Sequence, residues 1–475
     1  MGLISLKFAI FFIVLLFVYY LVPPKYQWKV LLAGSLLFYL LAAPRCIIFL
    51  LISIVSTWYL MRKPVKSHWY LTLFINLGLL IFFRYGVYFK VHDLMIPLGI
   101  SFYTFMTIGY AHDCLGGKAE PCTSLPEYAL YISYFPQITQ GPIGTYGNMM
   151  GQLVAYHPYD VSNIKEGGYR IIKGLFKKLV IAGRLTYYVD TVFSDVRGHG
   201  GLTLLIAVFF YAIELYADFS GYMDIACGIS RMLGITLTEN FKRPYFSRDI
   251  QEYWRRWHIS LNEWFKEHLM MPAVTAKWNK NAANFLARFF PKARKGTLRT
   301  VCPLILVWII TGIWHGAEDV YIGWGIYFAI IMLISVCSMS GIKSFKKKHN
   351  WNNENRFYII FCTLRTFFIV LMGEVMFRAE SMKDALHIYR TIFTGMRLGI
   401  SDITAALTPF GNGNQALASV LILTVLIAGL FIVELMKEKN EQAFTRHRYI
   451  YGGALLFATA VLGSLGQSNF MYQAF

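Results

Sequence analysis

The chain has 475 residues, of which 56% are hydrophobic and 15% are charged, and its mean hydropathy is +0.47. Soluble domains carry about a quarter charged residues, so this composition excludes an ordinary soluble globule and predicts an all-α, polytopic membrane protein. The formal net charge of +19 is spread over short segments between apolar runs. This is the positive-inside pattern, so we expect contact with anionic lipid and not with nucleic acid.

Ten apolar runs are long enough to be predicted as membrane spans. They are 3–22, 29–43, 46–61, 68–83, 202–220, 301–316, 320–338, 358–377, 417–436 and 449–466. Three weaker runs, 97–111, 125–141 and 167–190, contain Pro, Gly or Lys. We expect these three to be short, tilted or re-entrant and to line a protein interior, because irregular backbone is not tolerated against lipid.

Basic loops predict the orientation. Lys25 to Lys29, Arg62 to Lys66, Lys277 to Arg299, Lys343 to Lys348 and Lys437 to Arg448 are all expected to be cytoplasmic. Between consecutive basic loops the chain crosses the membrane outward once and returns once. Because the first span precedes the first cytoplasmic loop, the N-terminus is expected outside; the spans within 84–238 are too irregular to count. The last span, 449–466, then carries the C-terminal tail (the unit 449–475) outside. We expect one integral domain over 1–475 in the cytoplasmic membrane.

Seven scattered cysteines without a C-x-x-C pair predict neither a disulfide framework nor a thiolate metal site, and no metal site is expected. The chain also lacks a Walker A loop, a G-x-S-x-G elbow, an H-E-x-x-H motif and a G-x-G-x-x-G loop. ATPases, serine hydrolases and zinc proteases of those types are therefore excluded.

Two histidines that each follow a tryptophan are the main candidates for chemistry. His315 ends the run that begins near Val301, which places it about 21 Å along a helix, past the membrane midplane. An ionisable group at that depth usually faces a cavity, and an imidazole suits a general base. Trp314 is expected to form a wall of the site, and Gly312 and Gly316 to permit close backbone approach. The alternative is a packed or interfacial histidine.

The second histidine, His258, lies in the segment 239–299. This segment holds thirteen Lys/Arg against five acids, with four tryptophans interleaved. It is either an interfacial amphipathic segment or a cytoplasmic mouth that attracts a polyanionic acyl donor. Candidates for tunnel lining or donor binding are Trp257, Arg255, Arg256 and Asn262.

Three acids, Glu214, Asp218 and Asp224, interrupt an apolar run. They indicate either a proton path, as in a transporter, or structural anchors for the basic segment 242–256, and we favour the anchors. Asp218 is kept as a further tunnel candidate.

Several stretches together resemble the membrane-bound O-acyltransferase family, in particular its bacterial alginate O-acetylation and teichoic-acid D-alanylation branch. They are Pro97 to Phe105, Phe135 to Ile143, Asp218 to Tyr222, Glu239 to Phe241, Tyr253 to Ser260, Gly312 to Gly316 and Phe377 to Ser381. The resemblance covers roughly 95–395. The chain departs from alginate-type members at Leu269 to Val274, where a Gly-Gly loop is missing, and this leaves the acceptor polymer open.

The resemblance, with the span count, implies a ring of about 11–12 transmembrane helices with re-entrant segments around a central tunnel. It implies that His315 is the principal catalytic histidine and His258 the second. It also implies acetyl-CoA, or an acyl carrier phosphopantetheine, as donor substrate with no bound cofactor. The acceptor would be an extracytoplasmic polysaccharide, served by an esterase-like transferase partner.

The last six residues, Phe470 to Phe475, resemble the F-x-Y-x-x-F tail of an accessory peptide in teichoic-acid D-alanylation. Tyr472 is therefore either an acyl relay or an aromatic interfacial anchor.

The favoured interpretation is an O-acyltransferase, in which His315 takes the acceptor proton and His258 positions or polarises the thioester carbonyl, or the two histidines exchange these roles. Alternatives are D-alanyl transfer from a carrier protein to teichoic acid, and a proton-coupled exporter of a polysaccharide or lipid-linked precursor.

Overall fold

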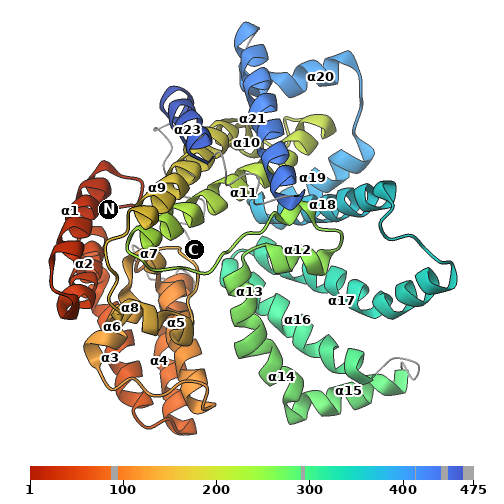
Figure 1. Ribbon diagram of the computed structural model, residues 1–475. Coiled ribbons are helices and arrows are strands. Elements are labelled where there is room, and N and C mark those ends of the chain that lie inside the picture. The colour runs from red at the N-terminus through yellow and green to blue at the C-terminus, as the bar shows by residue number, and fades with distance from the viewer. Residues whose placement is uncertain (87–94, 290–294, 412, 440–447, 464–475) are drawn as a thin grey trace.

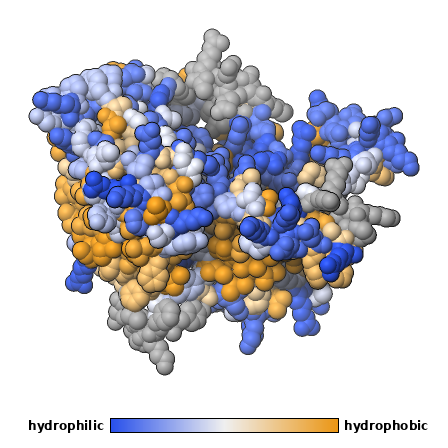
Figure 2. Space-filling model, turned by 90° about the horizontal axis from the view of Figure 1, so that it is seen from below, coloured by the Kyte–Doolittle hydropathy of each residue, from blue (hydrophilic) through white to orange (hydrophobic). Residues whose placement is uncertain are grey.

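The computed structural model describes residues 1–86, 95–289, 295–411, 413–439 and 448–463. In these ranges the regular elements are helices, together with one isolated antiparallel bridge between Phe241 and Trp257. An apolar band crosses the surface, with hydrophilic side chains above and below it (Figure 2). The prediction of an all-α, polytopic membrane protein is confirmed.

Each of the ten predicted spans contains a helix. The helices are α1 Leu6–Leu21, α2 Gln27–Ala42, α3 Ile47–Met61, α4 Lys66–Tyr85, α11 Gly201–Met232, α16 Lys295–His315, α17 Asp319–Lys348, α18 Arg356–Arg378, α21 Asn414–Lys439 and α23 Arg448–Leu462. Seven helices of the described chain are long and apolar enough to cross a membrane, fewer than the 11–12 expected. Three predicted spans are missing from this number because α1, α2 and α23 have only 15 or 16 residues, and the weaker runs add none because their helices have at most 16 residues.

The three weaker runs are short or interrupted, as predicted. The first is α5 Ile100–Leu115, buried from Ile100 to Ala111. The second breaks at Tyr134 between α6 Leu125–Ser133 and α7 Phe135–Ile138, and 139–144 continue as buried irregular chain. The third is α9 Val161–Leu175, a π-helical turn (η4) Phe176–Ala182 and α10 Gly183–Phe193. Irregular backbone here lies against protein, which satisfies its polar groups away from lipid.

The long helix α11 forms the centre of the fold, and α9 packs along it in the opposite direction (Figure 1). Glycines make this contact. A Cβ atom on Gly174 would lie 2.5 Å from the carbonyl oxygen of Gly221, and one on Gly167 would lie 2.5 Å from that of Gly228. Small residues let backbones approach closely where lipid offers no hydrophobic drive for helix association.

Contacts between helix ends agree with the predicted orientation. Arg84 at the end of α4 donates to the carbonyl oxygen of His315 at the end of α16 (2.5 Å). Tyr20 at the end of α1 donates to the carbonyl oxygen of Met232 at the end of α11 (2.7 Å). The first pair joins two ends predicted to be outer, and Tyr20 borders the cytoplasmic loop at Lys25.

The remaining helices complete two flanks. They are α8 Tyr146–Val154, α12 Ile250–Arg256, α13 Ile259–Phe265, the π-helical turn (η6) Lys266–Met270, α14 Met271–Thr275, α15 Lys277–Phe289, α19 Met382–Thr394 and α20 Ile400–Leu407. Figure 1 shows α1 to α6 on one side of α11 and α12 to α17 on the other. The candidate site lies on the second side, among α11 to α13 and α16 to α18.

Candidate active site

His258 and His315 line one cavity of about 130 Å³, and both are buried, at 4% and 5% exposure. Most of the wall is aromatic or aliphatic. Its apolar members are Leu215, Trp254, Trp257, Leu261, Phe265, Met270, Leu304, Val307, Trp308, Trp324, Met332 and Phe377. The other polar members are Asn262, Lys266, Thr311 and Glu374. Because Lys266 is exposed, the cavity connects the two buried rings to a charged rim.

His315 is the last residue of α16, so its ring lies at the far end of that helix from the basic loop. Rings of Trp324 and Phe377 contact it edge-on, with centroids 5.0 and 4.9 Å away. These rings come from α17 and α18, so three helices fix the imidazole.

The close approach of α16 to α17 depends on two glycines. A Cβ atom on Gly312 would lie 2.5 Å from the carbonyl oxygen of Tyr321, and one on Gly325 would lie 2.5 Å from that of Trp308. A Cβ atom on Gly316 would lie 2.3 Å from the Tyr321 ring. The predicted close backbone approach is confirmed at Gly312, whereas the group that approaches Gly316 is a side chain.

His258 occupies a left-handed turn, with φ 45° and ψ 54°, that begins α13. Two asparagines hold this uncommon conformation. Asn240 accepts from the backbone N–H of Ile259 (3.0 Å) through its carbonyl and from that of Ser260 (2.9 Å) through Oδ1. The Asn262 amide nitrogen lies 2.8, 2.6 and 3.2 Å from the carbonyl oxygens of Trp254, Trp257 and His258.

The His258 ring stands at 90° to the ring of Phe219, with centroids 4.8 Å apart. Among the described residues, neither of its ring nitrogens has a hydrogen-bond partner. Burial lowers the pKa of His258, so the ring is neutral near pH 7. A neutral imidazole offers one donor and one acceptor to whatever enters the cavity.

Glu374 is a site residue that the sequence reasoning missed. It lies in the apolar run of α18, is 3% exposed and lines the histidine cavity. Its Oε2 atom has no hydrogen-bond partner within the described chain. Phe377, which contacts His315, is three positions on and therefore on the same helix face. A single carboxyl within the predicted span 358–377 was the available signal, since ionisable groups within spans are usually functional.

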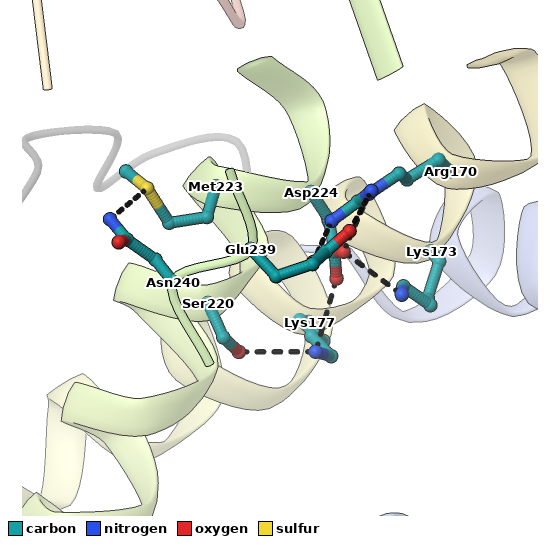
Figure 3. Close-up of polar contacts among 8 residues, drawn as sticks. All are labelled: Arg170, Lys173, Lys177, Ser220, Met223, Asp224, Glu239 and Asn240. Atoms are coloured by element: carbon teal, nitrogen blue, oxygen red, sulfur yellow. Dashed lines mark hydrogen bonds and ion pairs between the residues drawn. The ribbon is translucent and has the colours of Figure 1, made fainter. Parts of the chain in front are cut away.

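A second, larger cavity of about 710 Å³ lies beside the first. Ile259 lines this cavity, whereas its neighbour His258 lines the first. Three cations converge on buried Asp224 there: Lys173 (2.9 Å) and Arg170 (3.2 Å) of α9, and Lys177 (3.1 Å) of the π-helical turn η4 (Figure 3). Arg170 also forms a bidentate pair with Glu239 at 2.6 and 2.5 Å.

The prediction that Asp224 anchors the basic segment 242–256 was wrong. Its partners lie on α9 and the π-helical turn η4, and the acid that holds Arg243 (2.6 Å) and Arg256 (2.9 Å) is Glu438. Glu214 accepts from the Thr186 hydroxyl instead (2.6 Å).

The other predicted site residues fall into two groups. Trp257 and Asn262 line the histidine cavity. Trp314, Arg255, Arg256 and Asp218 are not among its lining residues. The Trp314 ring is tilted against the rings of His315 (4.7 Å between centroids) and Phe105 (5.5 Å), Arg255 lines a separate basic cleft, and Asp218 pairs with Lys178. Tyr472 lies outside the described residues.

Comparisons with known proteins identify relatives of this chain. The model described as MBOAT, membrane-bound O-acyltransferase family, matches residues 47–277. The probable alginate O-acetylase AlgI of Pseudomonas putida is 30% identical over 424 residues, which cover 84% of this chain and 81% of that protein. This chain belongs to the membrane-bound O-acyltransferase family. The peptidoglycan O-acetyltransferase of Helicobacter pylori is 30% identical over 409 residues, 76% of this chain and 72% of that protein.

A D-alanylating relative is also similar. The teichoic acid D-alanyltransferase of Bacillus subtilis is 28% identical over 297 residues, 61% of this chain and 70% of that protein. For the probable AlgI of Pseudomonas fluorescens, 32% identical, the match spans 58% of the relative. The O-acyltransferase class replaces the exporter alternative.

Proposed function

We propose that this O-acyltransferase moves an acetyl group from acetyl-CoA at the cytoplasmic side of the cytoplasmic membrane toward hydroxyls of an extracytoplasmic polysaccharide. The observation that carries the proposal is the meeting of two buried imidazoles, His258 and His315, in one cavity with a charged rim at Lys266. Relatives named as alginate and peptidoglycan O-acetylating enzymes support the acetyl group and the polysaccharide class.

The proposed reaction is a direct transfer. His315 removes the proton from the attacking hydroxyl while its oxygen adds to the thioester carbonyl. The neutral His258 ring donates its N–H to the oxyanion that forms. The carbon–sulfur bond then breaks, and the proton held by His315 passes to the leaving thiolate. No cofactor is consumed, because the thioester supplies the activated acyl group.

Cations near the rim suit a phosphate-bearing donor. A cleft of about 780 Å³ beside the cytoplasmic ends of α17 and α18 is lined by Arg248, Arg255, Lys343, Lys346 and Arg365, against one acid, Asp249. Arg255 follows Trp254, which lines the histidine cavity. We assign the cleft to phosphate groups, of the donor or of anionic lipid.

Tyr472 is proposed as an acyl relay. The described chain ends just after Leu462, whose carbonyl oxygen accepts from Arg184 Nε (3.1 Å). Ten further residues span at most about 35 Å when extended, enough to reach far into the protein. The phenol oxygen would take the acyl group and pass it to a hydroxyl held by an esterase-like extracytoplasmic transferase. A Tyr472→Phe variant that acylates polymer at the wild-type rate would exclude this relay.

One observation favours a second candidate, D-alanyl transfer from a carrier protein to teichoic acid. The buried carboxyl of Glu374 faces the cavity and would complement the ammonium group of a D-alanyl thioester. The two candidates predict opposite outcomes for Glu374→Gln. This variant would retain acetyl transfer but would lose D-alanyl transfer.

The test uses full-length protein in lipid nanodiscs with labelled acetyl-CoA or a D-alanyl carrier protein. His315→Ala and His258→Asn should abolish transfer, and asparagine keeps the left-handed turn because it tolerates positive φ. His387→Gln, in α19 and not among the cavity-lining residues, is the matched control. Full activity in both cavity variants would refute the proposal.

A further inference from the structure

Three metal-ligating side chains meet beside the mouth of the histidine cavity, outside the proposed catalytic machinery. His112 and Asp113 lie in the last turn of α5, and His268 lies in the π-helical turn η6. One ligand atom from each lies within 4.8 Å of the other two. We propose that this cluster binds a divalent transition-metal ion of the Zn²⁺ class.

The hydrogen bond of His268 orients the ring as a metal ligand. Its Nδ1 lies 3.2 Å from the carbonyl oxygen of Trp264, and in the neutral ring that donates to this oxygen the lone pair is on Nε2. That nitrogen lies 3.3 Å from Asp113 Oδ1, itself an acceptor. Metal-binding histidines typically donate their other N–H to a carbonyl in this way.

His112 supplies the third ligand atom. Its Nδ1 is buried without a hydrogen-bond partner in the described chain and lies 3.7 Å from Asp113 Oδ1. Adjacent ligands on a tetrahedral zinc ion, at about 2.0–2.1 Å from it, are roughly 3.3 Å apart. Both measured separations from Asp113 are close to that edge length. Two imidazoles and one carboxylate leave the fourth position for water, since the Asp113 and His112 side chains are 14% and 24% exposed.

The position of the cluster gives the ion a structural consequence. His268 lies between Lys266 and Met270, which both line the histidine cavity. Trp264 binds the same segment to α5 through its N–H to the carbonyl oxygen of Phe105 (2.8 Å). An ion bound by both α5 and η6 would therefore hold Lys266 and Met270 in place at the opening of the histidine cavity.

No pattern in the sequence predicts this site. His112 and Asp113 are adjacent, but His268 comes 155 positions after Asp113. Only the packing of η6 on α5 brings them together, so no spacing motif exists.

The test is metal content, measured on the full chain purified without a polyhistidine tag. After chelation and re-addition of Zn²⁺, the wild type should retain about one ion per chain, with three protein ligands and one water. Asp113→Asn and His268→Gln should each lower this content at least tenfold. His199→Gln, in the loop between α10 and α11, is the control and should retain the ion.

Two further readouts do not depend on enzymatic activity. Co²⁺ substitution should give the visible absorption bands of a tetrahedral site in the wild type and in His199→Gln alone. Zn²⁺ should raise the melting temperature of the wild type and chelator should reverse the rise. Equal zinc content in the wild type and His268→Gln, or no reversible uptake by the wild type, would overturn the proposal and leave an ion-paired His–Asp–His cluster.

Discussion

Replacing Gly312 with alanine should slow acyl transfer strongly while leaving the protein folded. The new Cβ atom would lie 2.5 Å from the carbonyl oxygen of Tyr321, whereas ordinary contact begins at 3.4 Å. α16 must therefore move away from α17 by about 0.9 Å, and His315 lies one turn further along α16. A misplacement of about 1 Å can cost on the order of a hundredfold in rate. The overpacking itself should cost about 1–3 kcal/mol of stability.

The assay compares initial rates of acetyl transfer and melting temperatures in nanodiscs. Gly296→Ala on α16 and Gly341→Ala on α17 are matched controls, because a Cβ atom at either position has nothing within 4 Å. Both controls should retain the wild-type rate. A folded Gly312→Ala protein with the same rate as the controls would refute the argument that helix spacing sets the position of His315.

Three other changes test the supports of the site. Asn262→Ala removes the amide that lies against three backbone carbonyls around His258. The activation free energy should rise by about 1–3 kcal/mol, so that kcat falls with little change in KM; an unchanged kcat would contradict this role. Asp224→Asn leaves buried Lys177 and half-buried Arg170 and Lys173 without their carboxylate and should destabilise the protein by about 3–5 kcal/mol, so an unaltered melting temperature would count against the ion cluster. The hydrogen bond from the Ser381 hydroxyl lowers the pKa of Asp384. The ionised Asp384 carboxylate therefore stabilises the fold at pH values above the ordinary carboxyl pKa, and this stabilisation is lost as the pH falls through the lowered pKa. Asp384→Asn should remove that acid-side loss in thermal melts, and an identical pH profile would exclude it.

The helices and both histidines could be predicted because their signals are local. Ten apolar runs became helices, and each histidine follows a tryptophan in an otherwise unusual setting. The interrupted runs were also readable, since Pro136 and the Lys177–Lys178 pair mark the break after α6 and the π-helical turn.

The other residues that line the histidine cavity could not be predicted in the same way. The Trp314 ring lies 4.7 Å from the His315 ring but is not among the residues that line the cavity, because successive residues of a helix point about 100° apart. The tryptophan that lines the cavity beside His315 is Trp324 of the next helix. Which side chains line the same cavity depends on the packing of α16, α17 and α18, and proximity in the sequence does not predict it.

The error over Asp224 has a different cause. The acid was matched with the nearest basic segment in sequence. Arg170, Lys173 and Lys177 recur at intervals of three and four residues, which predicts that all three share one helix face; they lie on α9 and the π-helical turn η4 that continues it. That periodicity was visible in the chain, but the antiparallel contact through Gly174 and Gly221 that brings this face to Asp224 was not.

The turn at His258 connects these observations. A left-handed residue at the start of α13 sends His258 and Ile259 into two different cavities, one holding the second imidazole and one holding the ion cluster of Asp224. If α13 began with ordinary helical backbone, these two side chains would follow the helix, and the hydrogen bonds of Asn240 and Asn262 would not be needed to hold the turn. Residues kept in sparsely populated conformations persist where the surroundings enforce them, and they concentrate at functional sites. The hydrogen bonds around His258 are thus better explained by the need to hold its imidazole in the histidine cavity, beside the second cavity, than by the stability of a seven-residue helix.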